Sequence, residues 1–167
     1  MPIPAADLVA RLTVAGQTVA VAESLTGGLV TAALTDVAGA SVVVQGSVVA
    51  YATDLKSQLL GVDAALLARV GAVDADVAEQ MASGVRSLMG ATYGLATTGV
   101  AGPDRVDGQA VGTVYVAVVG PGSSRVKSLD LSGDRGDIRA QSVLAVLSLL
   151  AEVLDAQGRE EPPGVHG

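Results

Sequence analysis

The sequence predicts an α/β protein, a three-layer α/β/α sandwich around a central, mixed five-stranded sheet. Helical and strand-like segments alternate along the chain, which is typical of α/β domains. The run over 18–22 is apolar at almost every position, as in a strand buried on both faces. The short connection between Val119 and Arg125 carries Pro121 and Gly122 and predicts a hairpin, so the sheet is expected to contain antiparallel pairs.

The first elements are a helix, a strand and a second helix. The helix over 5–15 has apolar residues at helical spacing and ends at Gly16. The strand over 18–22 leads into a glycine-rich turn over 23–28, and apolar residues at helical spacing continue over 29–37.

The middle of the chain is predicted to add one strand and three helices. The strand covers 42–51, with Gly46 marking a bulge or a close approach of the backbone. Asp74 is a suitable N-cap for the longest of the three helices. The helices cover 54–60, 64–70 and 74–89.

The last third is predicted to contain three strands and a long helix. The strands cover 92–98, 111–119 and 125–131. Asp134 can cap the final helix, whose apolar residues run to Leu154. Residues 1–156 are therefore expected to form a single domain, and the polar, proline-containing segment 157–167 a flexible tail.

Composition excludes several classes of function. The chain has 167 residues, of which 50% are hydrophobic and 16% charged, so it can bury a core. With no Phe or Trp and three Tyr it lacks stacking platforms for single-stranded nucleic acid. A net charge of −7 disfavours duplex binding, so we expect no nucleic-acid partner.

The same inventory restricts the chemistry and the location. There is no Cys, and the single histidine is His166, so no metal site and no Cys or His catalysis are expected. The longest apolar stretch, 143–154, is too short to span a bilayer, and the N-terminus lacks a basic signal region. We expect a cytoplasmic protein without a membrane partner.

Ser24 is the first candidate for chemistry. It follows a buried strand and precedes a helix opened by Gly27 and Gly28, at the sheet edge where α/β proteins bind ligands. The free N–H groups of such a helix start can hold an oxyanion or a phosphate. The alternative is that Ser24 or Thr26 merely caps the helix.

Lys56 is the second candidate. It is one of two lysines in the chain, and Tyr51 precedes it by five residues. A serine without a histidine needs another base, and a lysine can serve if burial lowers its pKa toward neutrality. The alternative is a solvated lysine on a short helix.

Two further segments suggest an anionic ligand. Thr98 and Gly99 end a predicted strand and open a glycine loop, whose alternative is an ordinary turn. Arg135 and Arg139 lie in the first turns of the final helix, where positive charge costs about 0.3–1 kcal/mol each unless an anion binds there. Pairing with a nearby aspartate is the alternative.

Several motifs together resemble one known family. In their order and approximate spacing, from about 5 to 154, they resemble the C-terminal domain of the competence/damage-inducible protein CinA, a family that includes stand-alone nicotinamide mononucleotide (NMN) deamidases. The matching segments are 22–28, 46–51, Lys56 with 59–62, 98–103, 111–114, and 133–135 with 138–139.

The resemblance implies an amidohydrolase that converts NMN to nicotinate mononucleotide and ammonia, without a cofactor. It implies Ser24 as the nucleophile, Lys56 as its base and Tyr51 as the residue that orients Lys56. We further expect the substrate to be bound by residues near the strand ends. These are Thr26, Gly27, Gly28, Thr98, Gly99, Arg135 and Arg139.

Two departures and two rival functions accompany this interpretation. Leu25 stands where the family commonly has Cys, and the loop 104–110 lacks the glycine-rich, Lys-Pro pattern of the family. The rivals are a non-catalytic binding module that acts through a protein partner and a Ser-Lys hydrolase of another carboxamide. Small domains rich in Ala and Val often self-associate, which leaves a homo-oligomer open.

Overall fold

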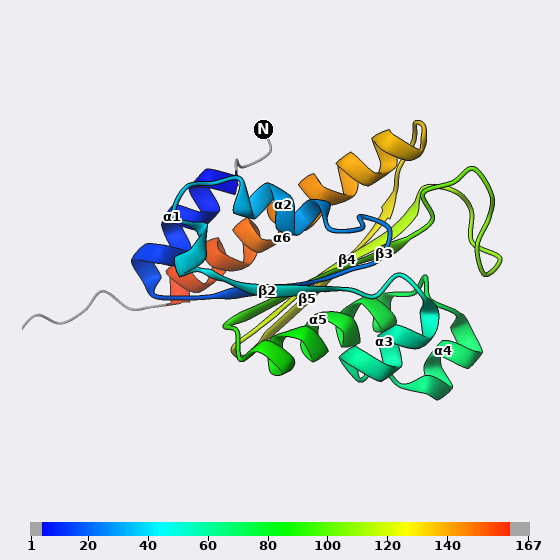
Figure 1. Cartoon of the computed structure of the whole chain (residues 1–167), viewed down its shortest axis with the longest axis horizontal. Coiled ribbons are helices and arrows are strands. Elements are labelled where there is room, and N and C mark those ends of the chain that lie inside the picture. The colour runs from blue at the N-terminus through cyan, green and yellow to red at the C-terminus, as the bar shows by residue number, and fades with distance from the viewer. Residues whose placement is uncertain (1–4, 161–167) are drawn as a thin grey trace, which may run out of the picture.

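The computed structural model describes residues 5–160, and these form three layers (Figure 1). A five-stranded sheet lies in the middle. The helices α1 (Ala5–Ala15), α2 (Leu29–Thr35) and α6 (Arg135–Glu160) cover one face. The other face is covered by α3 (Thr53–Leu60), α4 (Ala64–Val70) and α5 (Ala75–Met89). The predicted α/β sandwich is confirmed.

The sheet is mixed, as predicted. Its strands are β1 (Val19–Glu23), β2 (Val44–Val49), β3 (Tyr93–Gly99), β4 (Thr113–Gly120) and β5 (Ser123–Asp130), in the spatial order β2-β1-β3-β4-β5. The first three strands pair in parallel, and β4 pairs antiparallel with both β3 and β5. Because β1, β2 and β3 run the same way, their carboxyl ends meet at one edge of the sheet.

The start of the second strand differs from the prediction. A short 3-10 helix, η1 (Ala40–Val42), precedes β2, so the strand begins at Val44 rather than at 42. The pairing with β1 shifts by one residue next to Gly46, which confirms the predicted irregularity there. A Cβ at Gly46 would lie 3.0 Å from Sδ of Met89, so the backbone also approaches α5 closely.

The two faces of β1 have different side chains. Val19 and Val21 point into a core of Val and Leu beneath α1, α2 and α6. Ala20 and Ala22 face α5, and small residues on this side let the helix lie close to the sheet. At Gly94 in β3, an added Cβ would come within 1.9 Å of the Ala82 carbonyl oxygen on α5.

A second close contact of α5, made with α3, fixes the position of α3. Gly84 on α5 lies against the end of α3, where an added Cβ would come within 1.8 Å of the Leu60 carbonyl oxygen. Only a glycine fits between these two helices without moving α3. Since α3 carries Lys56, this contact places the lysine relative to the sheet edge.

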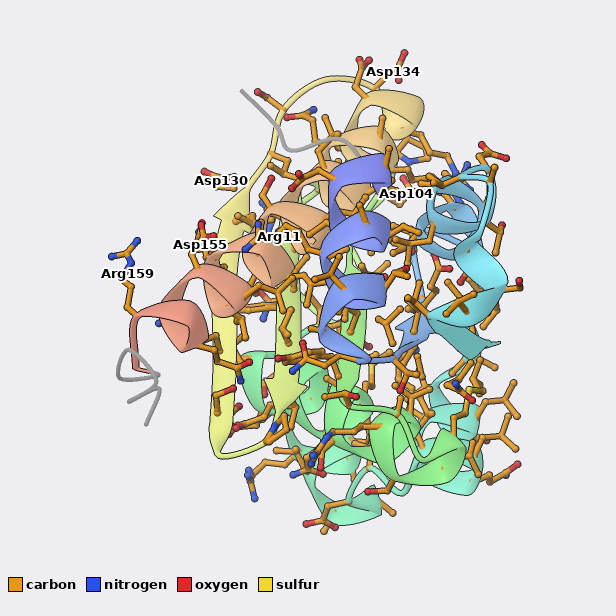
Figure 2. All side chains as sticks on the ribbon, turned by 90° about the vertical axis from the view of Figure 1, so that its left-hand side faces the viewer. Arg11, Asp104, Asp130, Asp134, Asp155 and Arg159 are labelled. Atoms are coloured by element: carbon orange, nitrogen blue, oxygen red, sulfur yellow. The ribbon has the colours of Figure 1, made fainter. Side chains whose placement is uncertain are left out.

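The final helix continues beyond the predicted end of the domain. It remains helical through Glu160, whereas the sequence predicts a flexible tail from 157. The Tyr93 hydroxyl donates to Gln157, and Arg11 on α1 lies 2.6 Å from the Asp155 carboxylate (Figure 2), so tertiary contacts hold the last turns. Residues 161–167 of that predicted tail, with His166, lie outside the described residues.

No helix within residues 5–160 is long and apolar enough to cross a membrane.

Candidate active site

The turn after β1 positions Ser24. The Ser24 N–H donates to the Thr97 carbonyl oxygen at 3.1 Å, which ties the start of the turn to β3. Gly27 and Gly28 take positive φ angles of 59° and 109°, which lets the chain reverse into α2. The Ser24 side chain is buried and points toward α3 rather than toward the start of α2, as its contact with Lys56 shows.

Glu23, not Ser24 or Thr26, caps helix α2. Its fully buried carboxylate accepts the Val30 N–H at 2.9 Å and the Thr31 N–H at 3.0 Å. It also accepts the hydroxyls of Thr26 at 2.6 Å and Thr31 at 2.7 Å. A carboxylate is favourable at a helix N-terminus, where N–H groups lack partners. The capping alternative for Ser24 is therefore wrong.

Lys56 faces Ser24 across the sheet edge. Its Nζ donates to Oγ of Ser24 at 3.0 Å and to the Ala50 carbonyl oxygen at 2.7 Å. The Ala50 N–H in turn donates to the Glu23 carbonyl oxygen at 2.9 Å, which fixes the acceptor. Lys56 is only 1% exposed, so the alternative of a solvated lysine is also wrong.

Burial changes the acidity of Lys56. Removing the ammonium group from water lowers the pKa of Lys56 to about 8, and the Asp107 carboxylate opposes part of that shift. A fraction of the amine is then neutral near physiological pH, with a lone pair that can accept the Ser24 proton. The arrangement is a buried nucleophile within hydrogen-bond distance of a base.

The pair opens onto a cavity of about 160 Å³ at the carboxyl ends of β1, β2 and β3. Thr98 and Gly99, two of the residues expected to bind substrate, line it. The Thr98 hydroxyl is tied down, since it donates to the Ala72 carbonyl oxygen at 2.7 Å. The glycine loop after β3 is therefore part of the wall and not a remote turn.

Tyr51 and Arg135 stand together at the rim of this cavity. Nη1 of Arg135 donates to the Gly102 carbonyl oxygen at 2.6 Å, and Nη2 donates to the Tyr51 hydroxyl at 3.1 Å. Both side chains line the cavity, and Tyr51 is 58% exposed. The Tyr51 hydroxyl thus contacts Arg135, whereas the Ala50 carbonyl orients Lys56.

Arg139 holds the turn that follows β1. It donates through Nε to the Leu25 carbonyl oxygen at 3.0 Å and through Nη2 to the Thr26 carbonyl oxygen at 3.3 Å. Neither arginine forms an ion pair among residues 5–160; Asp134 and Asp137 accept each other's N–H at the start of α6. Asp134 thus caps α6, as predicted.

Four predicted substrate-binding residues lie outside the cavity lining. They are Thr26, Gly27, Gly28 and Arg139. The Thr26 hydroxyl is occupied by Glu23 and Thr97, and the Gly27 N–H donates to the Ser24 carbonyl oxygen at 3.1 Å. The Leu25 N–H has no hydrogen-bond partner among the described residues, and Leu25 lines the cavity. These four residues hold the turn, and Leu25 is the better-placed donor.

Sequence reasoning missed Glu23 and Asp107. The signal for Glu23 is an acidic residue directly before a glycine-opened helix, where a carboxylate fits the unpaired N–H groups. Asp107 lies in the loop that departs from the family pattern, and its carboxylate accepts the Ala72 N–H at 3.0 Å. No local pattern predicts a contact between residues 35 positions apart.

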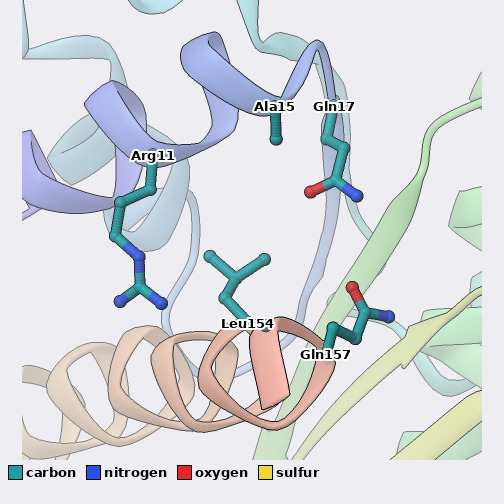
Figure 3. A pocket seen from close by; sticks show the side chains of 6 residues that line it. Arg11, Ala15, Gln17, Leu154 and Gln157 are labelled. Atoms are coloured by element: carbon teal, nitrogen blue, oxygen red, sulfur yellow. The ribbon is translucent and has the colours of Figure 1, made fainter. Parts of the chain in front are cut away.

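A larger cavity lies elsewhere and holds no such pair. It has a volume of about 210 Å³ between the C-terminal halves of α1 and α6 (Figure 3). Gln17 and Gln157 face each other across it, and no nucleophile with an adjacent base lines it. The cavity at the strand ends is the candidate active site because Ser24 and Lys56 line it within hydrogen-bond distance of each other.

Comparison with known proteins shows the family of the chain. The CinA C-terminal domain family model matches residues 4–154. A CinA-like protein from Frankia casuarinae is 51% identical over 137 residues, which are 82% of this chain and 32% of that protein. A CinA-like protein from Mycolicibacterium gilvum is 45% identical over 154 residues, 91% of this chain and 36% of that protein. The chain spans about a third of the length of these curated relatives.

Solved structures of similar size share the fold. A CinA superfamily protein from Klebsiella pneumoniae superposes with a TM-score of 0.87 at 31% identity, over 91% of this chain and 96% of the other. The competence/damage-inducible protein CihA from Agrobacterium tumefaciens gives a TM-score of 0.84 at 33% identity, over 93% and 98%. With its family match, its relatives and its fold in agreement, the chain belongs to the CinA C-terminal domain family.

Proposed function

We propose that the chain is an amidohydrolase that converts NMN to nicotinate mononucleotide and ammonia. The observation that carries this proposal is the 3.0 Å contact between the buried Lys56 amine and the Ser24 hydroxyl. NMN as the substrate follows from the family resemblance. It is supported by the guanidinium of Arg135 at the cavity rim, which suits the 5′-phosphate in a chain of net charge −7.

The first half of the reaction forms an ester. Neutral Lys56 takes the proton of Ser24 as Oγ attacks the carboxamide carbon, and the carbonyl oxygen becomes an oxyanion. The Leu25 N–H, which belongs to the residue after the nucleophile and has no partner among the described residues, is our candidate donor to that oxyanion. The Lys56 ammonium then returns its proton to the leaving nitrogen, and ammonia departs as the ester with Ser24 forms.

The second half regenerates the enzyme. Lys56, neutral again, takes a proton from a water that attacks the ester carbon. The tetrahedral intermediate collapses, Ser24 leaves with the proton returned from Lys56, and the nicotinate carboxyl group is released. One water is consumed and one ammonia is formed for each NMN.

The test is to incubate the purified chain with NMN and to measure ammonia and nicotinate mononucleotide together. We expect both products in equal amounts, with turnover that survives a chelator. Nicotinamide, nicotinamide riboside and an unrelated carboxamide serve as comparison substrates. Absence of ammonia from every carboxamide would support the binding-module alternative, and faster turnover of another carboxamide would reassign the substrate.

A further inference from the structure

The loop between β3 and β4 forms part of the wall of the candidate site. It lies at the same end of the molecule as α3 and α4 (Figure 1). Its tip is closed by paired backbone hydrogen bonds between Val106 and Gln109. Asp107 at this tip has a φ of 50°, a left-handed conformation that aspartate tolerates better than most residues. Asp104 and Val106 of the same loop line the cavity.

Asp107 fastens this loop to the connection between α4 and α5. Its Oδ2 accepts the Ala72 N–H at 3.0 Å, while the Ala72 carbonyl oxygen accepts the Thr98 hydroxyl at 2.7 Å. The backbone of Ala72 is therefore held from both sides, and Ala72 and Val73 form part of the cavity wall.

Gly71 leaves the space that this contact needs. A Cβ at Gly71 would lie 2.6 Å from the carboxyl carbon of Asp107, and Gly71 has a positive φ of 77°. A side chain at this position would push the carboxylate away from Ala72. The sequence thus provides both the carboxylate and the gap that receives it.

The carboxylate also acts on Lys56 through its charge. Asp107 raises the pKa of Lys56 against the larger lowering by burial. Besides Lys56, the titratable or charged side chains that line the cavity are Tyr51, Asp104 and Arg135, and α4 and α5 contribute none. Asp107 itself lies outside the cavity lining. The Glu23 carboxylate, next to Ser24 in the sequence, accepts hydrogen bonds from the N–H groups of the first turn of α2.

We propose that Asp107 is a positioning residue that fastens the loop 104–110 to Ala72 in the cavity wall and, from outside the cavity lining, supplies a counter-charge to Lys56. The proposal rests on the proposed function for its effect on catalysis. Its structural and electrostatic parts are independent of the substrate. Two variants distinguish the structural part from the electrostatic part. Asp107→Asn keeps an oxygen acceptor for the Ala72 N–H but removes the charge, and Asp107→Ala removes both.

The number of lysines makes the electrostatic test simple. The chain has two lysines, Lys56 and Lys127, so protein labelled with ¹³C-lysine gives two sets of side-chain signals. Lys127 lies on β5, is half exposed and pairs with Glu152, and it serves as the internal reference. Titration of the labelled wild type, Asp107→Asn and Asp104→Asn follows the charge on Lys56 directly, with or without NMN turnover.

We expect the pKa of Lys56 to fall in Asp107→Asn, because a nearby carboxylate favours the ammonium form. The pKa of Lys127 should stay constant. Asp104→Asn is the matched control: it removes a carboxylate from the same loop without the Ala72 contact, and should change Lys56 less. Equal pKa values of Lys56 in wild type and Asp107→Asn, or an equal fall in both variants, would overturn the electrostatic part.

Amide hydrogen exchange tests the fastening. The Ala72 N–H should exchange at least about tenfold faster in Asp107→Ala, because it loses its acceptor, and stay protected in Asp107→Asn. Unchanged protection in Asp107→Ala would overturn this part.

Kinetics then link the result to function. The pH at which kcat/KM for NMN reaches half of its plateau should fall in Asp107→Asn by the same amount as the Lys56 pKa. A lowered Lys56 pKa with an unmoved kinetic profile would overturn the catalytic effect of Asp107. Lack of NMN turnover by the wild type, with the titration and exchange results as expected, would overturn the proposed function alone.

Discussion

The floor and the rim of the candidate site are built in different ways. At the floor, Ser24 and Lys56 are buried. The Ser24 N–H is bonded to the Thr97 carbonyl oxygen, and the Ala50 N–H is bonded to the Glu23 carbonyl oxygen. At the rim, Tyr51, Asp104 and Arg135 are exposed. Tyr51 and Arg135 are joined by a single hydrogen bond. The floor is held by the sheet itself, whereas the rim is held by contacts between loops and the start of α6.

This difference separates chemistry from recognition. A base must lose water to become neutral near physiological pH, and a nucleophile must be held in one geometry, so both belong in the packed floor. A charged substrate group keeps part of its hydration, so its partners can remain at the surface. Changes at the floor should therefore affect kcat, and changes at the rim should mainly affect KM.

Ser24→Ala should have the largest effect. It removes the nucleophile, for which no other group can substitute, and should lower kcat for NMN by at least about 10³-fold. Because Glu23 caps α2, the melting temperature should change little. Both quantities are measured on one preparation. A variant that keeps a substantial share of the wild-type kcat would show that Ser24 is not the nucleophile.

Lys56→Arg should have the second-largest effect on kcat. Arg keeps a positive charge but stays protonated at any working pH, so it cannot take the Ser24 proton, and kcat should fall by about 10²- to 10⁴-fold. Steady-state ammonia release from NMN measures this loss.

Lys56→Met is the matched control for the Lys56→Arg change. It should be equally inactive, and at pH 7 it should be at least as stable as the wild type because it removes the cost of burying an ammonium group. Near-normal kcat in Lys56→Arg would show that charge alone is needed.

Arg135→Ala should have an intermediate effect, mainly on KM. A charge-assisted hydrogen bond contributes about 1.5–3 kcal/mol, so kcat/KM for NMN should fall by about 10- to 100-fold. Nicotinamide riboside lacks the phosphate and should lose much less. Equal losses on both substrates would indicate damage to the site rather than loss of a phosphate contact.

Tyr51→Phe should have the smallest effect of these changes. It removes the hydroxyl that accepts from Arg135, which corresponds to about 0.5–1.5 kcal/mol or a 2- to 10-fold change in kcat/KM through KM. The pH profile should not move, since the Ala50 carbonyl orients Lys56. A shift of the pH profile in this variant would place Tyr51 at the floor of the site.

The floor was the more predictable region from the sequence. Buried strands, glycine-opened turns and helix caps are local patterns, so the elements that carry Ser24 and Lys56 are predicted within a few residues of their observed bounds. That Ser24 and Lys56 form a pair came from the family resemblance. Nothing in their 32-residue separation shows that the side chains meet.

The rim was less predictable because its contacts are made between distant segments. Tyr51 follows its strand as an exposed residue, and its partner Arg135 lies 84 positions away. The extra helical turn after residue 156 has a similar cause, since the contact of Gln157 with Tyr93 joins the last helix to the sheet. Such contacts depend on the whole fold and leave no periodic signal.

The central claim is that a buried, neutral Lys56 activates Ser24, and the pH dependence of kcat/KM for NMN tests it most directly. Between pH 7 and 10 the phosphate of NMN no longer titrates, so the profile reports the free enzyme. Because only the neutral amine can accept the Ser24 proton, kcat/KM should rise with pH through about 8 and then level off, following the lowered pKa of Lys56. A profile that is flat, or that falls with pH across this range, would contradict the account.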